Sequence, residues 1–580
     1  MQYRRVLVSV LLALVSAWQV SASVASPRAP SPAEMDRDLL EVTIPQLQRY
    51  YAQHKYTVTQ VVQWHLARIE RYNGIYRAVE TQMRAAAIAD AAREDAEAGA
   101  AARGPLWGVP IVIKANTSIA GQVTTDGWDG FTIPGHELIA PRDATVVAKL
   151  RAAGAVILGH TNMPDFANSD TNRSSSFGRT GNAYDVRFSP GGSSGGTVTA
   201  VTANMAVLGN GTDTGNSIRM PSATSGVIGV FPTRGLVSIA GIAPLDWMLD
   251  NTGPIARTVT DAAIALSVMA GEDPLDPVTA HSAAKAEPGP YTQYLKLDAL
   301  KGKRFGVPSF ILKGTGIPFR GTPAAVPDSA AAKQAAEQAN PLDPRTRAAF
   351  LKAVDELRAA GATVLVDDSI LPDSFAVSAS RISTYSYVRE GTDRFLNDFG
   401  PAQYHSAADY EKVVGVPLGA PMIGTEPSNA RFPSAQPSNA QSDSIAIYQR
   451  AIESDPDAEA NYYGPRRRTL QVYLDTLDRL HLDGYVYPAI QMPPMDETMP
   501  QEGRVSEGPH SATSWVNMLG VPAVVVVGGF YPNGLPFGLE FSARPWKDGD
   551  LLGYAYAWEQ ATHHRHPPVL VEKGLLPAAP

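Results

Sequence analysis

The sequence contains no cysteine among its 580 residues. This absence excludes disulfide bonds, thiol nucleophiles and metal sites built from thiolates. The 11 histidines include no H-E-x-x-H motif and no other paired metal-ligand spacing, and three of them, at 563, 564 and 566, stand in a polar tail. We therefore expect neither a metal nor any other cofactor.

An excess of positive charge is also missing. The formal net charge is −8, and 18% charged with 44% hydrophobic residues is ordinary globular composition. Such a surface offers no electrostatic reason to bind nucleic acid or an anionic membrane. We expect the partner to be a small or neutral molecule, and nothing in the sequence points to a particular oligomeric state.

Long hydrophobic runs are absent except at the N-terminus. There, Arg4 and Arg5 precede an apolar run of thirteen residues, 6–18, and small residues follow through Ala22 and Ala25. This layout predicts a signal peptide over residues 1–25, too short to span a bilayer comfortably. The alternative is an uncleaved anchor. Cleavage predicts a mature protein that is secreted or periplasmic and has no membrane contact.

The order of apolar runs and turns predicts an α/β fold. Thr43 and Thr57 each begin a helix with a glutamine at the capping-box position. Residues 109–113 and 523–527 are continuous apolar runs typical of buried strands. Because helices and strands alternate, we expect a central mixed β-sheet with helices on both faces.

Three segments stand apart from this alternation. Residues 26–39 predict a spacer rich in proline and serine near its start, ahead of the main part of the chain, 40–575. Within it, residues 314–344 and 424–444 contain few large apolar residues. They predict exposed or partly disordered loop insertions, which are either plain spacers or parts of the active-site mouth.

The segment 189–219 contains two serines, each in a glycine-rich turn. Residues 191–196 read GGSSGG, residues 211–219 read GTDTGNSIR, and a short apolar run, 198–208, connects them as a buried element. Glycines beside a serine let backbone N–H groups approach whatever the hydroxyl attacks. Residues 209–215 also match G-x-G-x-x-x-G, but the spacing differs from a dinucleotide motif and no P-loop lysine follows.

Upstream, Lys114 stands at the C-terminal end of the strand predicted over 109–113. Lys114 together with the two serine turns resembles the amidase signature family of serine amidohydrolases, and the resemblance extends from about residue 40 to the C-terminus. It implies one large domain in which Lys114 is the base, Ser193 relays the proton and Ser217 is the nucleophile. Ser193 would follow a cis peptide bond.

The resemblance also implies the groups around these three residues. The oxyanion hole would consist of the backbone N–H groups of Thr214, Gly215, Asn216 and Ser217. Three further residues would hold these groups in position without contacting the substrate: Ser194, Asp213 and Arg219. The loop 160–168 would line the substrate pocket with Met163, Phe166 and Asn168.

Two positions depart from the usual pattern of the family. The residue after the lysine is usually aspartate and is here Ala115, so one hydrogen bond near the site must be supplied otherwise or not at all. The residue before the nucleophile is usually glycine and is here Asn216, which tolerates unusual φ better than most residues. Both changes bear on substrate preference and leave the three catalytic residues untouched.

The sequence thus predicts an exported serine amidohydrolase that acts on a small-molecule or peptide amide. Three substrate classes compete: peptides with a C-terminal amide, small aryl or acyl amides, and a broad range of amides, esters and carbamates. Export argues against the family's amidotransferase subunits, which need cytoplasmic partners. The alternative outside catalysis is a silent binding protein on the same fold.

Overall fold

The computed structural model describes residues 30–97, 103–424, 428–433, 444–497 and 509–568. The predicted signal peptide lies outside these ranges. The chain divides into two compact units, Met1–Leu40 and Glu41–Pro580. In the described helices, no segment is both long and apolar enough to cross a bilayer.

The first unit contains helix α1 (Pro32–Leu39), which falls within the predicted spacer. The Ser31 hydroxyl accepts a hydrogen bond from the Glu34 backbone N–H, and the Glu34 carboxylate accepts one from the Ser31 N–H. With Pro32 in the first turn, these residues form a complete helix start. The prediction of a plain spacer over 26–39 overlooked this capping box.

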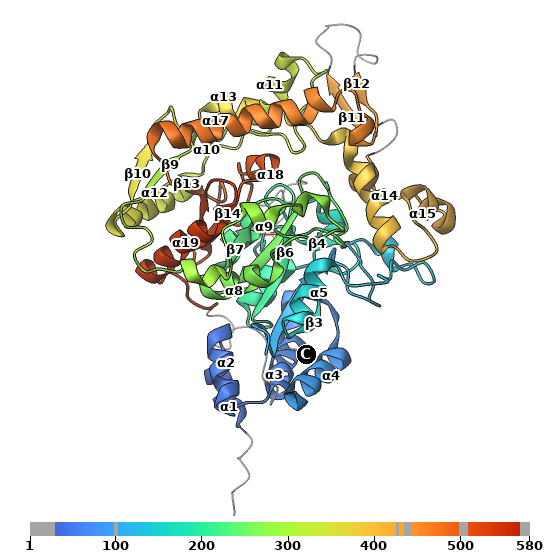
Figure 1. Cartoon of the computed structure of the whole chain (residues 1–580), viewed down its shortest axis with the longest axis vertical. Coiled ribbons are helices and arrows are strands. Elements are labelled where there is room, and N and C mark those ends of the chain that lie inside the picture. Colours follow the sequence, from blue (N-terminus) through green and yellow to red (C-terminus); the bar gives the residue numbers. More distant parts are fainter. Residues whose placement is uncertain (1–29, 98–102, 425–427, 434–443, 498–508, 569–580) are drawn as a thin grey trace, which may run out of the picture. The chain divides into compact units, whose positions relative to one another are not determined.

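In the second unit, eleven strands of the described residues form one mixed sheet (Figure 1). Across the sheet they follow the order β1 (Val79–Gln82), β3 (Ala155–Thr161), β2 (Val109–Lys114), β6 (Leu208–Asp213), β8 (Asn251–Ala256), β7 (Ile228–Phe231), β14 (Ala523–Phe530), β15 (Pro536–Ser542), β13 (Gly484–Pro488), β9 (Arg304–Val307) and β10 (Thr363–Val366). The predicted α/β fold with a mixed sheet is confirmed. Strand β14, near the C-terminus, joins the same sheet as β2.

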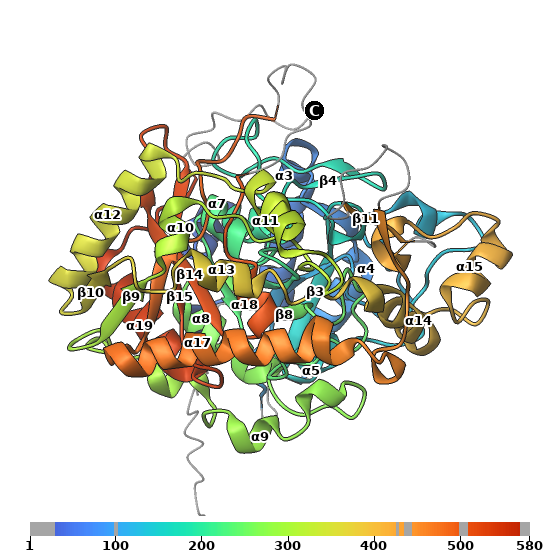
Figure 2. The ribbon, with the colours of Figure 1, turned by 90° about the horizontal axis from the view of Figure 1, so that it is seen from above.

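Helices flank this sheet, and Figure 2 shows α17 with α13 beside it. The longer helices and those that border the site are α2 (Ile44–Ala52), α3 (Val58–Tyr76), α4 (Arg84–Ala96), α5 (Thr145–Ala152), α6 (Gly195–Thr202), α7 (Arg219–Ser225), α8 (Val259–Met269), α12 (Pro344–Ala359), α13 (Asp373–Ala379), α17 (Gly464–Leu480) and α19 (Asp548–Thr562). The predicted capping boxes at Thr43 and Thr57 are confirmed.

The segment 189–219 contains more regular structure than two turns around a connecting run. Helix α6 begins at Gly195, and β6 extends through Asp213, so that residues 214–218 alone form the second turn. A Cβ on Gly196 would lie 2.3 Å from the Asn162 carbonyl oxygen. Glycine is therefore required here for close packing. Because β2 and β6 are parallel neighbours, their C-terminal ends meet at one edge of the sheet.

Both predicted insertions contain secondary structure. Helix α11 (Asp328–Glu337) lies within 314–344, and its residues Ala330, Ala331 and Ala335 are buried. Alanine forms helices readily and allows close packing, so a segment poor in large apolar residues still forms a buried helix. Near 424–444, β11 (Ser428–Pro433) pairs with β12 (Ser444–Ile447), while residues 425–427 and 434–443 are outside the described ranges.

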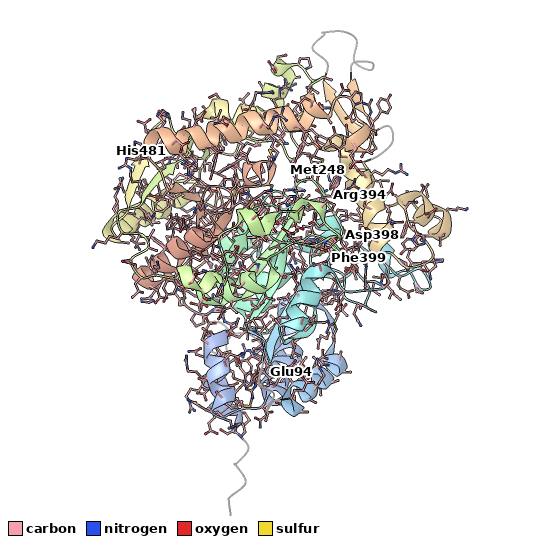
Figure 3. The ribbon with its side chains drawn as sticks, in the orientation of Figure 1. Glu94, Met248, Arg394, Asp398, Phe399 and His481 are labelled. Atoms are coloured by element: carbon pink, nitrogen blue, oxygen red, sulfur yellow. The ribbon has the colours of Figure 1, made fainter. Side chains whose placement is uncertain are left out.

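Helix α14 (Val388–Phe399) is fixed to the rest of the domain by aromatic and cationic side chains. Arg394 and Phe399 project from this helix (Figure 3). The Arg394 guanidinium lies 4.6 Å from the ring centroid of Trp247, and the Arg142 guanidinium lies 4.3 Å from that of Phe399. These contacts hold α14 against two segments, one that leads into β8 and one that leads into α5.

Candidate active site

Lys114 is the last residue of β2, and its side chain is completely buried. Its Nζ lies 2.7 Å from Ser193 Oγ, 2.8 Å from Thr212 Oγ1 and 3.3 Å from the Thr212 carbonyl oxygen. Burial lowers the pKa of Lys114 to about 7, although nearby carboxylates oppose this shift. A lysine that is neutral near pH 7 can accept a proton, which an ammonium group cannot.

Ser193 lies in the turn that precedes α6, and the peptide bond Gly192–Ser193 is cis. The side chain of Ser193 is completely buried beside Lys114. Its neighbour Ser194 donates its backbone N–H to the Ser217 carbonyl oxygen at 3.2 Å, and its hydroxyl to the Thr212 carbonyl oxygen at 3.2 Å. Ser194 therefore ties the first serine turn to the second.

Ser217 lies in the turn between β6 and α7 and lines a cavity, with 5% of its surface exposed. Among the described hydrogen bonds, none joins its hydroxyl to Ser193. Such catalytic contacts often tighten only in the complex with substrate. The backbone N–H groups of Gly215, Asn216 and Ser217 likewise have no acceptor in the described part of the chain. They can therefore bind an anionic oxygen.

A buried polar network holds the turn of Ser217. Asp213 Oδ2 accepts hydrogen bonds from the Ile218 backbone N–H at 2.9 Å and from Arg219 Nε at 3.1 Å. Arg219 Nη2 also donates to the Gly215 carbonyl oxygen at 2.8 Å. Thr214 is held separately, because its hydroxyl donates to Asp250 Oδ1 at 2.6 Å. The turn thus presents its N–H groups from a backbone fixed on both sides.

Three participants in this site were not singled out from the sequence. Thr212 is the second acceptor for Lys114, and its place on β6, two residues before Thr214, was a signal that could have found it. Asn517 Nδ2 donates to Asp213 Oδ1 at 2.9 Å, and Glu540 Oε1 accepts from Arg219 at 2.9 Å. Both come from the C-terminal part of the chain, where no local motif marks them.

The cavity beside Ser217 has a volume of about 800 Å³. Its charged and titratable lining consists of Asp170, Glu337 and His510, and no lysine or arginine lines it within the described ranges. Asn216 Nδ2 donates to Asp170 Oδ1 at 3.2 Å, so Asn216, the residue before Ser217, is part of the cavity wall. Burial raises the pKa of Asp170.

The three residues proposed for the pocket have different surroundings. Asn168 lines the cavity. Met163 instead packs in an apolar cluster with Ala115, and Phe166 packs against the ring of Trp128. Neither Met163 nor Phe166 is among the residues that line this cavity, so a role for these two in the substrate pocket stays a prediction.

The first predicted insertion contributes to the cavity, whereas a role of the second there stays a prediction. Residues 314–317 and 337–340 line the cavity, at the two sides of helix α11. Of the two interpretations of the first insertion, a plain spacer and a part of the active-site mouth, the structure favours the second.

Comparison with known proteins agrees with this geometry. The family model "Amidase" matches residues 60–317. A glutamyl-tRNA(Gln) amidotransferase subunit of Symbiobacterium thermophilum is 33% identical over 497 residues, which cover 82% of this chain and 88% of that protein.

Solved structures show the same relationship. The peptide amidase of Stenotrophomonas maltophilia is similar with a TM-score of 0.69 and 30% identity, over 91% of this chain and 98% of that one. An amidase family protein of Bacillus anthracis is similar in fold with a TM-score of 0.66 and 23% identity, over 92% of this chain and 93% of that one.

Proposed function

The chain belongs to the amidase signature family, and we propose that it is an exported serine amidohydrolase that splits a carboxylic amide into an acid and an amine or ammonia. The observation that carries this proposal is the buried contact between Lys114 Nζ and Ser193 Oγ at 2.7 Å. This contact links a base of lowered pKa to the turn beside Ser217.

In the first half of the reaction, Lys114 takes the proton of Ser193, and Ser193 takes the proton of Ser217. The Ser217 Oγ then forms a bond to the amide carbon, and the carbonyl oxygen becomes an anion. The backbone N–H groups of the turn 215–217 stabilise that anion. When the C–N bond breaks, Ser193 donates a proton to the leaving nitrogen and regains one from Lys114.

In the second half, water replaces the amine at the acyl group on Ser217. Its proton passes through Ser193 to Lys114 while its oxygen bonds to the acyl carbon. The ester bond to Ser217 then breaks, and Ser217 recovers its proton by the same relay. The products are a carboxylic acid and an amine, and the three side chains return to their starting states.

The cavity supports a substrate that is neutral or cationic near the scissile bond. Asp170 and Glu337 line the cavity without a lysine or arginine in its described lining, so a free carboxylate would meet no permanently charged cation there. A peptide that ends in an amide avoids this cost, and similarity to a peptide amidase favours the same class. Small aryl or acyl amides, and a broader range with esters and carbamates, are the alternatives.

The test is to incubate the purified mature protein with peptide amides, anilides, simple amides, esters and carbamates, beside Ser217→Ala. We expect turnover by the natural protein and none by the variant, since only Ser217 can carry the acyl group. Turnover that persists in Ser217→Ala would contradict the mechanism. If no compound reacts and a fluorophosphonate does not label Ser217, the protein is a silent binder.

Export is tested separately. We expect the mature N-terminus of the protein, expressed with residues 1–25 in a bacterial host, to begin after Ala22 or Ala25. Intact mass of the periplasmic fraction measures this. A full-length chain that stays in the cytoplasmic fraction would instead favour an amidotransferase role, for which the relative of Symbiobacterium thermophilum is named.

A further inference from the structure

Asp126 is a buried carboxylate that the catalytic mechanism does not use. Its side chain is completely inaccessible, and neither of its carboxylate oxygens has a hydrogen-bond partner within the described residues. Its backbone N–H donates to the Ala115 carbonyl oxygen at 3.2 Å, so Asp126 is held against the residue that follows Lys114. A buried carboxylate without partners is costly, and its presence calls for a reason.

The charges around Asp126 indicate that reason. Lys114 is the cation that acts on it, while Asp250, Asp165 and Glu80 repel it. Burial raises the pKa of Asp126 well above its ordinary value, and Lys114 works against this rise. A positively charged Lys114 therefore favours the ionised form of Asp126, so the charges of the two side chains are coupled.

Three carboxylates in turn act electrostatically on Lys114, those of Asp126, Asp213 and Asp250. Asp213 is already bound by Arg219, and Asp250 accepts a hydrogen bond from the Thr214 hydroxyl. Asp126 lacks any such partner in the part of the chain that the structure describes. Of the three carboxylates, Asp126 is therefore the one whose charge depends most on that of Lys114.

We propose that Asp126 is a positioning residue for the base: its carboxylate supplies the negative charge that stabilises the ammonium formed when Lys114 takes the serine proton. Because Ala115 has no polar side chain, this charge comes from a residue eleven positions further along, held against Ala115 by its backbone. The inference rests on the proposed function only in that Lys114 must act as the base for Ser217.

The test measures how fast a fluorophosphonate labels Ser217 as a function of pH, by intact mass. Labelling forms a bond between Ser217 Oγ and phosphorus, breaks the P–F bond and releases fluoride, while the hydroxyl proton passes through Ser193 to Lys114. The rate therefore reports the protonation of Lys114 without knowledge of the natural substrate.

Asp126→Asn is the main variant, because asparagine has the same shape and tolerates the positive φ of 48° at this position. We expect the acid limb of its rate profile to move about one pH unit lower, since the ammonium of Lys114 loses its counter-charge. We also expect the plateau rate to fall about tenfold, because a less basic lysine is a weaker base.

Two further variants serve as controls. Asp165→Asn removes a carboxylate that acts on Asp126 but is not among the charges that act on Lys114, and we expect an unchanged profile. Ala115→Asp combined with Asp126→Asn moves the carboxylate to the neighbouring residue. In that variant we expect the acid limb to return toward its natural position.

An acid limb of Asp126→Asn that coincides with that of the natural protein would overturn the proposal, provided thermal unfolding shows that the variant is folded. If Asp126→Asn does not fold, the single variant Ala115→Asp provides the test. An acid limb of its rate profile that moves to higher pH supports the proposal that a carboxylate near Ala115 stabilises the Lys114 ammonium. An acid limb that does not move overturns the proposal. If the fluorophosphonate labels Ser217 with the expected pH dependence but the protein hydrolyses no amide, the proposed function is refuted and the inference about Asp126 still holds.

Discussion

Arg219 and Glu540 form a completely buried ion pair, in which Arg219 Nη1 donates to Glu540 Oε1 at 2.9 Å across 321 positions of sequence. Arg219 begins α7 behind the nucleophile turn, and Glu540 lies on β15. The Tyr487 hydroxyl, on β13, also donates to Glu540 Oε1 at 2.9 Å. The C-terminal strands of the sheet thereby hold the turn on which Ser217 stands.

We expect Glu540→Ala to lower the free energy of unfolding by about 3 kcal/mol, because it leaves the buried charge of Arg219 short of one partner. Urea unfolding followed by circular dichroism measures this. The control is Asp478→Ala, which breaks the exposed pair with Arg544 and should cost less than about 1 kcal/mol. Equal effects of the two changes would contradict the special role of the buried pair.

Thr212→Val should lower kcat about tenfold to a hundredfold. The Thr212 hydroxyl is 2.8 Å from Lys114 Nζ, and a hydrogen bond to a charged group is worth about 1.5–3 kcal/mol. Thr252→Val is a matched control, since Thr252 faces Thr212 across the β6–β8 pair without contacting Lys114. Amide hydrolysis at saturating substrate measures both, and a similar loss in the two variants would mean a general packing effect.

Activity should rise with pH through about 7. The folded protein holds the pKa of Lys114 at about 7 by burial, so below that pH the side chain is an ammonium that cannot accept the serine proton. The pH dependence of kcat/KM for a substrate that does not titrate measures this. Lys114→Arg, which stays charged, should be inactive throughout the range. A profile that stays flat from about pH 8 to about pH 5 would exclude lysine as the base.

Asp170→Asn should reduce kcat/KM for cationic amides about tenfold relative to neutral amides. Asp170 lines the cavity and accepts a hydrogen bond from Asn216, and the amide variant keeps its shape while removing its charge. A pair of peptide amides, one with lysine and one with norleucine beside the scissile bond, provides the measurement. An unchanged ratio between the two substrates would show that the Asp170 carboxylate does not select the substrate.

Local patterns were enough to predict much of the fold. Capping residues marked the helices that follow Thr43 and Thr57, and a run of β-branched residues marked β14 as a central strand. These signals depend on neighbours a few residues away, so they can be found in a sequence. The burial of α11 was missed because alanine favours a helix whether or not anything covers it.

In the site, too, local patterns could be found in the sequence, whereas packing between distant segments could not. Glycine-rich turns and an apolar strand marked the surroundings of Lys114, Ser193 and Ser217, and the resemblance to the amidase signature family gave these three residues their expected roles. For the loop 160–168, the sequence could not show which side chains line the cavity and which pack in the hydrophobic core. Asn168 lines the cavity, whereas Met163 is buried among apolar side chains, and hydrophobicity alone does not tell which wall a side chain faces.

The sequence by itself determined which groups are proposed to react: one lysine, two serines and the glycines that let backbone N–H groups surround them. Only the tertiary structure decided how those groups behave. Burial lowers the pKa of Lys114, Glu540 completes the charge balance of Arg219, and the charge of Asp126 acts on Lys114. The physical reason is that desolvation and charge interactions depend on distances in space, which residues far apart in the chain acquire only when it folds.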